Sequence, residues 1–127
     1  NPKVVALEGT DARALNRTAI GDAVTAIVAD VSFISLTLAL PAALGLAAPG
    51  AWLIALIKPQ FEVGREAVGK GGVVRSEAAR RRAVAKVRRF IEDQPGWTIT
   101  GVIESPFPGG GGNEEFLLGA RRDERRS

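Results

Sequence analysis

Several charged side chains stand where apolar runs begin or end, at positions where chemistry could take place. Asp30 ends a run rich in valine and isoleucine, and Lys58 ends the following run, AWLIALI. Glu114 and Glu115 begin the last apolar run, EEFLLGAR. A lysine that loses hydration at the edge of an apolar core can take the proton of an attacking hydroxyl group, and nearby carboxylates can hold its amine. The residues predict either such an acid–base site or a structural salt bridge.

The composition excludes other kinds of catalytic site. The 127 residues include no His and no Cys, so a Cys/His zinc site, a cysteine nucleophile and a Ser-His-Asp triad are all excluded within this chain. We expect no metal site, and acid–base work must use Asp, Glu or Lys. The lack of disulfides fits a reducing compartment, so we expect a cytoplasmic location.

The apolar runs alternate with helical patterns. We expect strands at residues 4–7, 23–33 with its end at Asp30, 51–58, 97–105 and 114–121. We expect a helix at 35–46, kinked or started late by Pro41, and a second at 77–94 capped by Ser76. This alternation indicates an α/β fold with a mainly parallel sheet. The run at 23–33 is typical of a strand buried on both faces, and the last two strands should be antiparallel neighbours.

This arrangement would gather the charged residues at one edge of the sheet. Ligands bind at the carboxyl ends of the strands in open parallel sheets. Asp30 and Lys58 should lie there on adjacent strands, and an antiparallel last strand would start at the same edge. Alternation should then point either Glu114 or Glu115 at the site and the other one away.

A long loop and a basic segment follow Lys58. Residues 59–75 form a loop whose length indicates a functional or a disordered segment, and we favour function. Residues 65–89 hold nine Lys and Arg against two Glu, although the net charge of the chain is only +3. This segment is either a face that binds RNA or a solvated helix face.

The uncharged stretch between Val31 and Ile57 raises the question of a membrane span. A turn expected at Ala47–Gly50 divides it into two pieces, each shorter than a span. We therefore expect no membrane partner.

Three motifs resemble a known family. DVSFIS (Asp30–Ser35), ALIKPQFEVGREAVGKGGVVR (Ala55–Arg75) and GNEEFLL (Gly112–Leu118) are similar to the TlyA/hemolysin A family. That family belongs to the FtsJ-like S-adenosylmethionine-dependent methyltransferases, which act on ribose 2′-hydroxyls of ribosomal RNA. The resemblance implies that residues 1–127 are the C-terminal portion of one methyltransferase domain, with a frayed tail at 122–127. It implies a partial Rossmann-like sheet that lacks the first two strands.

The resemblance also implies roles for individual residues. Asp30, Lys58 and Glu115 match three members of the family's Lys-Asp-Lys-Glu tetrad, and Glu114 occupies a variable position. Lys58 would accept the proton of the ribose 2′-hydroxyl. The residues implied for S-adenosylmethionine are Asp11, Asp30, Ser32 and Phe33, and those for RNA are Arg65, Lys70, Arg75, Arg80 and Arg81.

The sequence also departs from the family pattern. The family's glycine-rich donor loop, the first lysine of the tetrad and an S4-type RNA-binding domain would all precede Asn1. We therefore expect the chain alone to bind S-adenosylmethionine weakly and to be inactive. The strand at Val4–Leu7 would lack its usual neighbours, and an open sheet edge would favour a homo-oligomer. Two alternatives stay open: a non-catalytic RNA-binding module, and a haemolysin, as the family name suggests.

Overall fold

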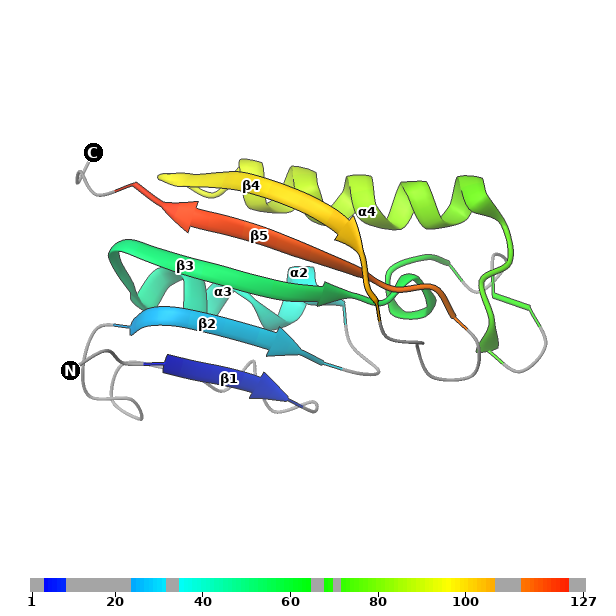
Figure 1. Ribbon diagram of the computed structural model, residues 1–127, viewed down its shortest axis with the longest axis horizontal. Helices are drawn as coiled ribbons and strands as arrows, with labels where there is room; N and C mark the ends of the chain where they lie inside the picture. The colour runs from blue at the N-terminus through cyan, green and yellow to red at the C-terminus, as the bar shows by residue number, and fades with distance from the viewer. Residues whose placement is uncertain are drawn as a thin grey trace.

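A computed structural model describes residues 4–8, 24–31, 35–64, 68–69, 72–106 and 113–123. Its sheet has the strand order β1-β2-β3-β5-β4 (Figure 1). The strands are β1 (Val4–Glu8), β2 (Val24–Asp30), β3 (Ala47–Ile57), β4 (Trp97–Glu104) and β5 (Phe116–Arg122). β1, β2 and β3 pair in parallel, whereas β5 is antiparallel to both β3 and β4. The α/β class and the antiparallel pairing of the last two strands are confirmed.

The helices begin and end close to where the sequence predicts. They are α2 (Leu36–Ala39), α3 (Pro41–Leu46), the 3-10 helix η2 (Pro59–Phe61) and α4 (Glu77–Glu92). Ser35 caps α2 by accepting a hydrogen bond from the Thr37 amide. The expected helix at 35–46 is broken at Leu40, because the proline ring of Pro41 is tolerated in the first turn of a helix but not in its interior. Ser76 caps α4 through the Ala79 amide.

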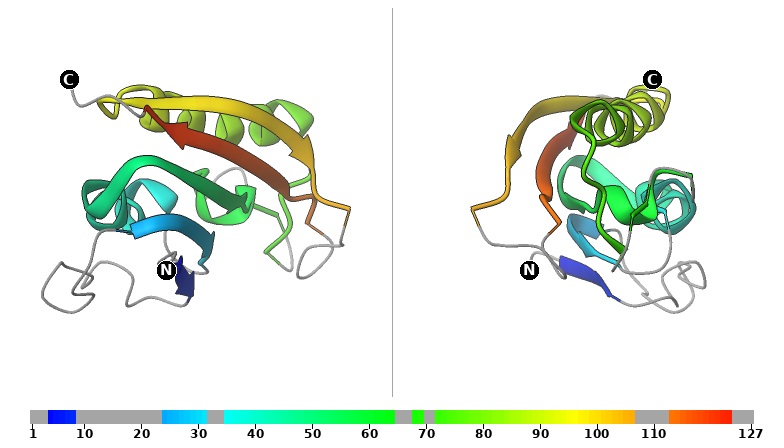
Figure 2. Two further views of the ribbon diagram at one scale, coloured as in Figure 1. Left: turned by 60° about the vertical axis from the view of Figure 1, so that its left-hand side comes forward. Right: turned by 90° about the vertical axis from the view of Figure 1, so that its right-hand side faces the viewer.

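The described helices α2, α3, η2 and α4 lie on one face of the sheet (Figure 2). The buried face of α4 carries Ala79, Ala83, Val87 and Ile91, at helical spacing. The core beneath the helices includes Leu53, Ile57 and Leu118, each 1% exposed or less. This packing fixes β3 and β5, beside whose ends Lys58 and Glu115 stand; Asp30 ends the neighbouring strand β2.

On the other face, β2 and β3 present exposed apolar side chains that no described helix covers. Trp52 and Ile54 in β3 are 45% and 42% exposed, and Val28 in β2 is 38% exposed. The prediction that the strand at 23–33 is buried on both faces is therefore wrong. In the described part of the chain, β3 alternates between a face covered by helices and a face open to solvent. β2 alternates in the same way from Ile27 onward, whereas Ala26 is buried on the open face.

A second correction concerns Ala47–Gly50, which belong to β3 and form no separate turn. In the pairing of β2 with β3, Val24 is paired with Ala47, and Ala26 is paired with Trp52. A step of two residues in β2 thus corresponds to a step of five residues in β3, so β3 bulges between these two pairs. Gly50 has a φ of 83°, a conformation that a glycine adopts without steric cost. The proline and glycine that suggest a turn therefore mark an irregularity inside a strand.

The expectation that the strand at Val4–Leu7 lacks a neighbour is also wrong. β1 pairs in parallel with β2 along its whole length, from Val4↔Ala26 to Glu8↔Asp30. The backbone of β1 forms hydrogen bonds with the edge of β2, and β1 becomes the outer strand of the sheet. Within the described residues, no helix is both long enough and apolar enough to cross a membrane.

Candidate functional site

Asp30 and Lys58 meet at the carboxyl ends of β2 and β3. The two strands are in register up to Ala29↔Ala55, so both chains leave the sheet at the same edge. Lys58 Nζ lies 2.6 Å from Asp30 Oδ1. The lysine side chain is only 14% exposed, whereas that of Asp30 is 53% exposed. The pair is therefore a charge-assisted contact with a covered amine and a carboxylate that solvent can reach.

Glu115 approaches the same edge from β5. Phe116 pairs with Ile57, the residue before Lys58, so Glu115 stands beside the end of β3. Glu115 is 7% exposed, and Gln60 Nε2 donates a hydrogen bond of 3.3 Å to its Oε2. Glu114 has a side chain that is 59% exposed and pairs with Arg80 instead. The burial of Glu115 and the exposure of Glu114 match the alternation that the sequence predicts.

Glu62 is a buried carboxylate that sequence reasoning missed. It accepts hydrogen bonds from Ser35 Oγ at 2.5 Å and from the Leu36 amide at 2.8 Å. Lys86 Nζ in α4 lies 3.3 Å from its Oε1 and donates to its backbone carbonyl at 3.0 Å. Glu62 therefore ties the segment that follows Lys58 to the start of α2 and to α4. The sequence feature that could have pointed to Glu62 is its position in the KPQFEV segment, directly after Lys58.

Asn113 has a similar structural role on the other side of the site. It is 5% exposed; its Oδ1 accepts from the Val74 amide at 2.8 Å, and its Nδ2 donates to the Gly72 carbonyl at 2.9 Å. Gly72 has a φ of 75°, which favours glycine. The described part of the long loop is thus fastened to the start of β5, and the GNEEF motif contains the residue that fastens it.

The residues proposed for RNA differ in their surroundings. The Arg81 side chain is 74% exposed and lies 3.6 Å from Glu77, and Arg75 is exposed. Arg80 is 18% exposed, donates to the carbonyls of Val74 and Arg75, and pairs with Glu114 at 3.4 Å. Arg80 therefore stabilises the loop. Arg65 and Lys70 lie outside the described residues.

Most residues implied for S-adenosylmethionine also lie outside the described part. These are Asp11, Ser32 and Phe33, and only Asp30 is described. No group of acidic residues in the described ranges has the arrangement of a metal site. A function can therefore be argued only from the described site residues, which are Asp30, Lys58, Glu115 and the residues that hold them in place.

Comparison with known proteins gives consistent matches. Residues 1–122 match the model of the FtsJ-like methyltransferases. The chain is 47% identical to the 16S/23S rRNA (cytidine-2′-O)-methyltransferase TlyA of Mycobacterium tuberculosis over 127 residues, which are 100% of this chain and 47% of TlyA. It is 34% identical to Hemolysin A of Brachyspira hyodysenteriae over 116 residues, which are 91% of this chain and 48% of that protein.

A solved structure agrees with these sequence matches. A candidate hemolysin from Lactococcus lactis superposes with a TM-score of 0.85 at 30% identity, over 97% of this chain and 69% of that one. The chain spans about half the length of the curated relatives it matches. The family match over residues 1–122, the sequence identities and the superposition agree, and the chain belongs to the TlyA/hemolysin group of the FtsJ-like methyltransferase family.

Proposed function

We propose that this chain carries the acid–base part of a centre that methylates a ribose 2′-hydroxyl of ribosomal RNA, with S-adenosylmethionine as methyl donor. The observation that carries the proposal is the Lys58–Asp30 contact of 2.6 Å at the carboxyl ends of two parallel strands. Buried Glu115 stands at the same edge. The 47% identity to TlyA, named as an rRNA (cytidine-2′-O)-methyltransferase, supports the same chemistry.

The proton transfer falls to Lys58. In its neutral form, the amine takes the proton of the 2′-hydroxyl while the ribose oxygen bonds to the methyl carbon. S-adenosylmethionine, when bound, would supply the methyl group: its carbon–sulfur bond would break as the new bond forms, and the electron pair would stay on sulfur as a thioether. A lysine side chain with 14% exposure suits this step, since little water competes for the amine.

Asp30, Glu115 and Gln60 would position the reacting groups. Asp30 holds the amine of Lys58 from the neighbouring strand, and its exposed carboxylate can be reached by a substrate. Gln60 donates to Glu115, while its own Oε1 is buried and accepts no hydrogen bond from the described residues. Gln60 would therefore hold Glu115 in place at the end of β3. We further propose that Asp11, Asp30, Ser32 and Phe33 contact the donor, in a cytoplasmic enzyme.

We propose that exposed basic residues bind the phosphates of the RNA. Arg75 and Arg81 are exposed, and Arg65 and Lys70 belong to the same basic segment. Arg80 has its guanidinium engaged by two carbonyls and by Glu114, so it would support this surface from beneath.

A chimera tests the proposed activity. This chain would replace the matching residues of M. tuberculosis TlyA, to which it aligns over its full length. We expect transfer of a labelled methyl group to ribosomal RNA, at a nucleotide that becomes resistant to alkaline cleavage because its 2′-oxygen is blocked. A folded chimera that binds RNA without transferring methyl groups would favour the second candidate, a non-catalytic RNA-binding module. The exposed arginines of α4 are the observation that supports that module.

The haemolysin alternative rests on the names of relatives such as Hemolysin A. Release of a dye from liposomes by the purified chain tests it directly. We expect no release at concentrations at which the chain binds RNA.

A further inference from the structure

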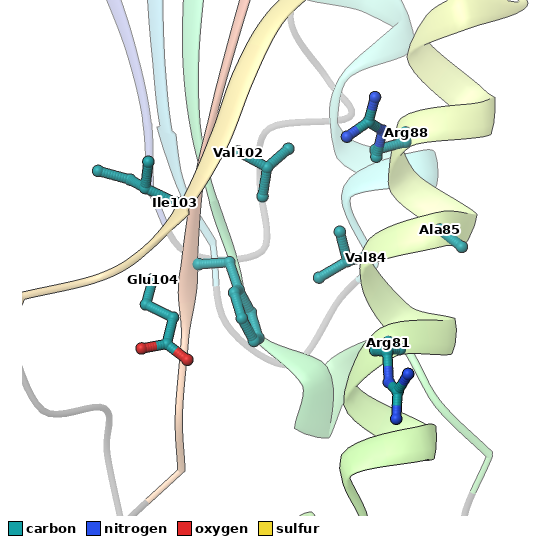
Figure 3. A pocket seen from close by; sticks show the side chains of 8 residues that line it. Arg81, Val84, Ala85, Arg88, Val102, Ile103 and Glu104 are labelled. Carbon is teal, nitrogen blue, oxygen red and sulfur yellow. The ribbon is translucent and has the colours of Figure 1, made fainter.

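A groove of about 440 Å³ lies between α4 and β4, at one side of the sheet (Figure 3). Its walls are mostly apolar, and Val84 and Val102 point toward one another across it. The lining residues are Arg81, Val84, Ala85, Arg88, Val102, Ile103, Glu104 and Phe116. A groove of this size with few polar groups is typical of sites that bind small planar or apolar groups.

Two arginines stand along the helical wall of the groove. Arg81 and Arg88 are seven residues apart in α4, which separates them by about 10 Å along the helix axis. Arg88 is exposed and has no ion-pair or hydrogen-bond partner among the described residues. Within the described ranges, Arg81 has a single ion pair, a loose contact of 3.6 Å with Glu77. Both guanidinium groups can therefore be engaged by an anion.

One end of the groove, lined by Glu104 and Phe116, lies toward the sheet edge that carries Lys58. Glu104 pairs with Phe116 across β4 and β5, and Phe116 pairs with Ile57 across β5 and β3. Two strand spacings, or about 10 Å, thus separate the end of the groove from the end of β3. An RNA strand that occupies the groove would have to span about this distance to reach Lys58.

We propose that this groove binds a nucleotide of single-stranded RNA that flanks the methylated one. The apolar walls would hold the base, while Arg81 and Arg88 would bind phosphates on either side of it. Glu104 would accept a hydrogen bond from an exocyclic amino group, which cytosine has and uracil lacks. The inference rests on the proposed function for its substrate, but the groove residues are separate from Asp30, Lys58 and Glu115.

The charges favour RNA over other occupants. A peptide that added to the exposed edge of β4 would not need two arginines seven residues apart. An anionic lipid surface would meet the carboxylate of Glu104 inside the groove. RNA has phosphates that can pair with the two arginines and amino groups on its base edges that can donate to the Glu104 carboxylate. It therefore provides partners for both the positive and the negative side chains of the groove.

The test measures binding of fluorescent hexacytidylate and hexauridylate to the purified chain by anisotropy. We expect tighter binding of hexacytidylate, and a loss of about tenfold in its affinity with Arg88→Ala. Arg89→Ala is the matched control, because it removes the same charge from an exposed position of α4 outside the groove. We expect it to change affinity by about twofold or less.

Two further variants test the walls and the carboxylate. Val84→Phe should fill part of the groove and weaken binding with no change in charge, with its fold checked by circular dichroism. Glu104→Ala should remove the preference for hexacytidylate, whereas Glu92→Ala, exposed on α4 outside the groove, should keep it.

Equal effects of Arg88→Ala and Arg89→Ala, together with equal affinities for the two oligonucleotides, would overturn the proposal. So would binding of anionic phospholipid vesicles in preference to either oligonucleotide. The proposed function can fail independently: an inactive chimera with binding that still depends on Arg88 would contradict the catalytic assignment alone. An active chimera with no such dependence would contradict the groove alone.

Discussion

The residues at the centre of the site differ in how well their contacts can be predicted from the sequence. Asp30 and Lys58 end consecutive apolar runs, and the carboxyl ends of adjacent parallel strands must meet, so their contact could be predicted. Glu62 and Asn113 could not be given roles in this way. Glu62 bonds to a residue 26 positions away, and Asn113 to residues 39 and 41 positions away. No local periodicity encodes such contacts, which depend on how loops settle on the finished sheet.

Asn113 offers a prediction about stability at the scale of one residue. Asn113→Ala should lower the free energy of unfolding by about 2 kcal/mol, because it leaves the buried Val74 amide without its acceptor. Urea denaturation measures this change. Glu114→Ala, at the adjacent exposed position, removes only a surface ion pair and should cost under about 1 kcal/mol. Equal losses would contradict the role given to Asn113.

At the scale of elements, the sequence predicts whether a segment is a helix or a strand better than it predicts the residues at which the segment begins and ends. Pro41 and Ser76 mark where α3 and α4 begin, because each residue has a local effect on the backbone. Pro49 and Gly50 predict a turn, whereas the structure has a bulge in β3, since the same residues suit both structures. α2 has four residues, too few for a helix that is stable alone, so contacts from elsewhere must hold it.

Glu62 supplies those contacts, and their removal should be measurable. Glu62→Ala should cost about 2 kcal/mol, because the Leu36 amide and the Ser35 hydroxyl lose their acceptor. Amide hydrogen exchange at Leu36 should accelerate more than exchange in α4. Glu77→Ala, in the exposed first turn of α4, is the control and should leave the Leu36 amide protected. Unchanged exchange at Leu36 in Glu62→Ala would show that α2 is held by other contacts.

At the scale of the whole molecule, the helices in the described residues cover one face of the sheet and leave the other open. The sequence did not reveal this, because β2 and β3 are apolar on both faces, and such a pattern predicts burial on both. The bare face holds Val28, Trp52 and Ile54, a larger apolar surface than isolated exposed residues would make.

The two tryptophans report on this asymmetry. Trp52 is 45% exposed on the bare face, whereas Trp97 is 6% exposed beneath α4. The variant Trp97→Phe, which retains Trp52, should have emission that acrylamide quenches several times more strongly than that of Trp52→Phe. Similar quenching in the two variants at low protein concentration would mean that the bare face is covered in solution.

The central claim is that Lys58 performs proton transfer in ribose methylation. The most direct test is the rate of methyl transfer by the chimera with TlyA under single-turnover conditions, for Lys58→Ala and for Glu114→Ala. We predict that Lys58→Ala lowers this rate by about 10²- to 10⁴-fold, as loss of a general base does, while Glu114→Ala stays within about threefold of the parent, since a surface ion pair has little energetic weight. Equal losses in the two variants, or a Lys58→Ala variant as active as the parent, would contradict the account.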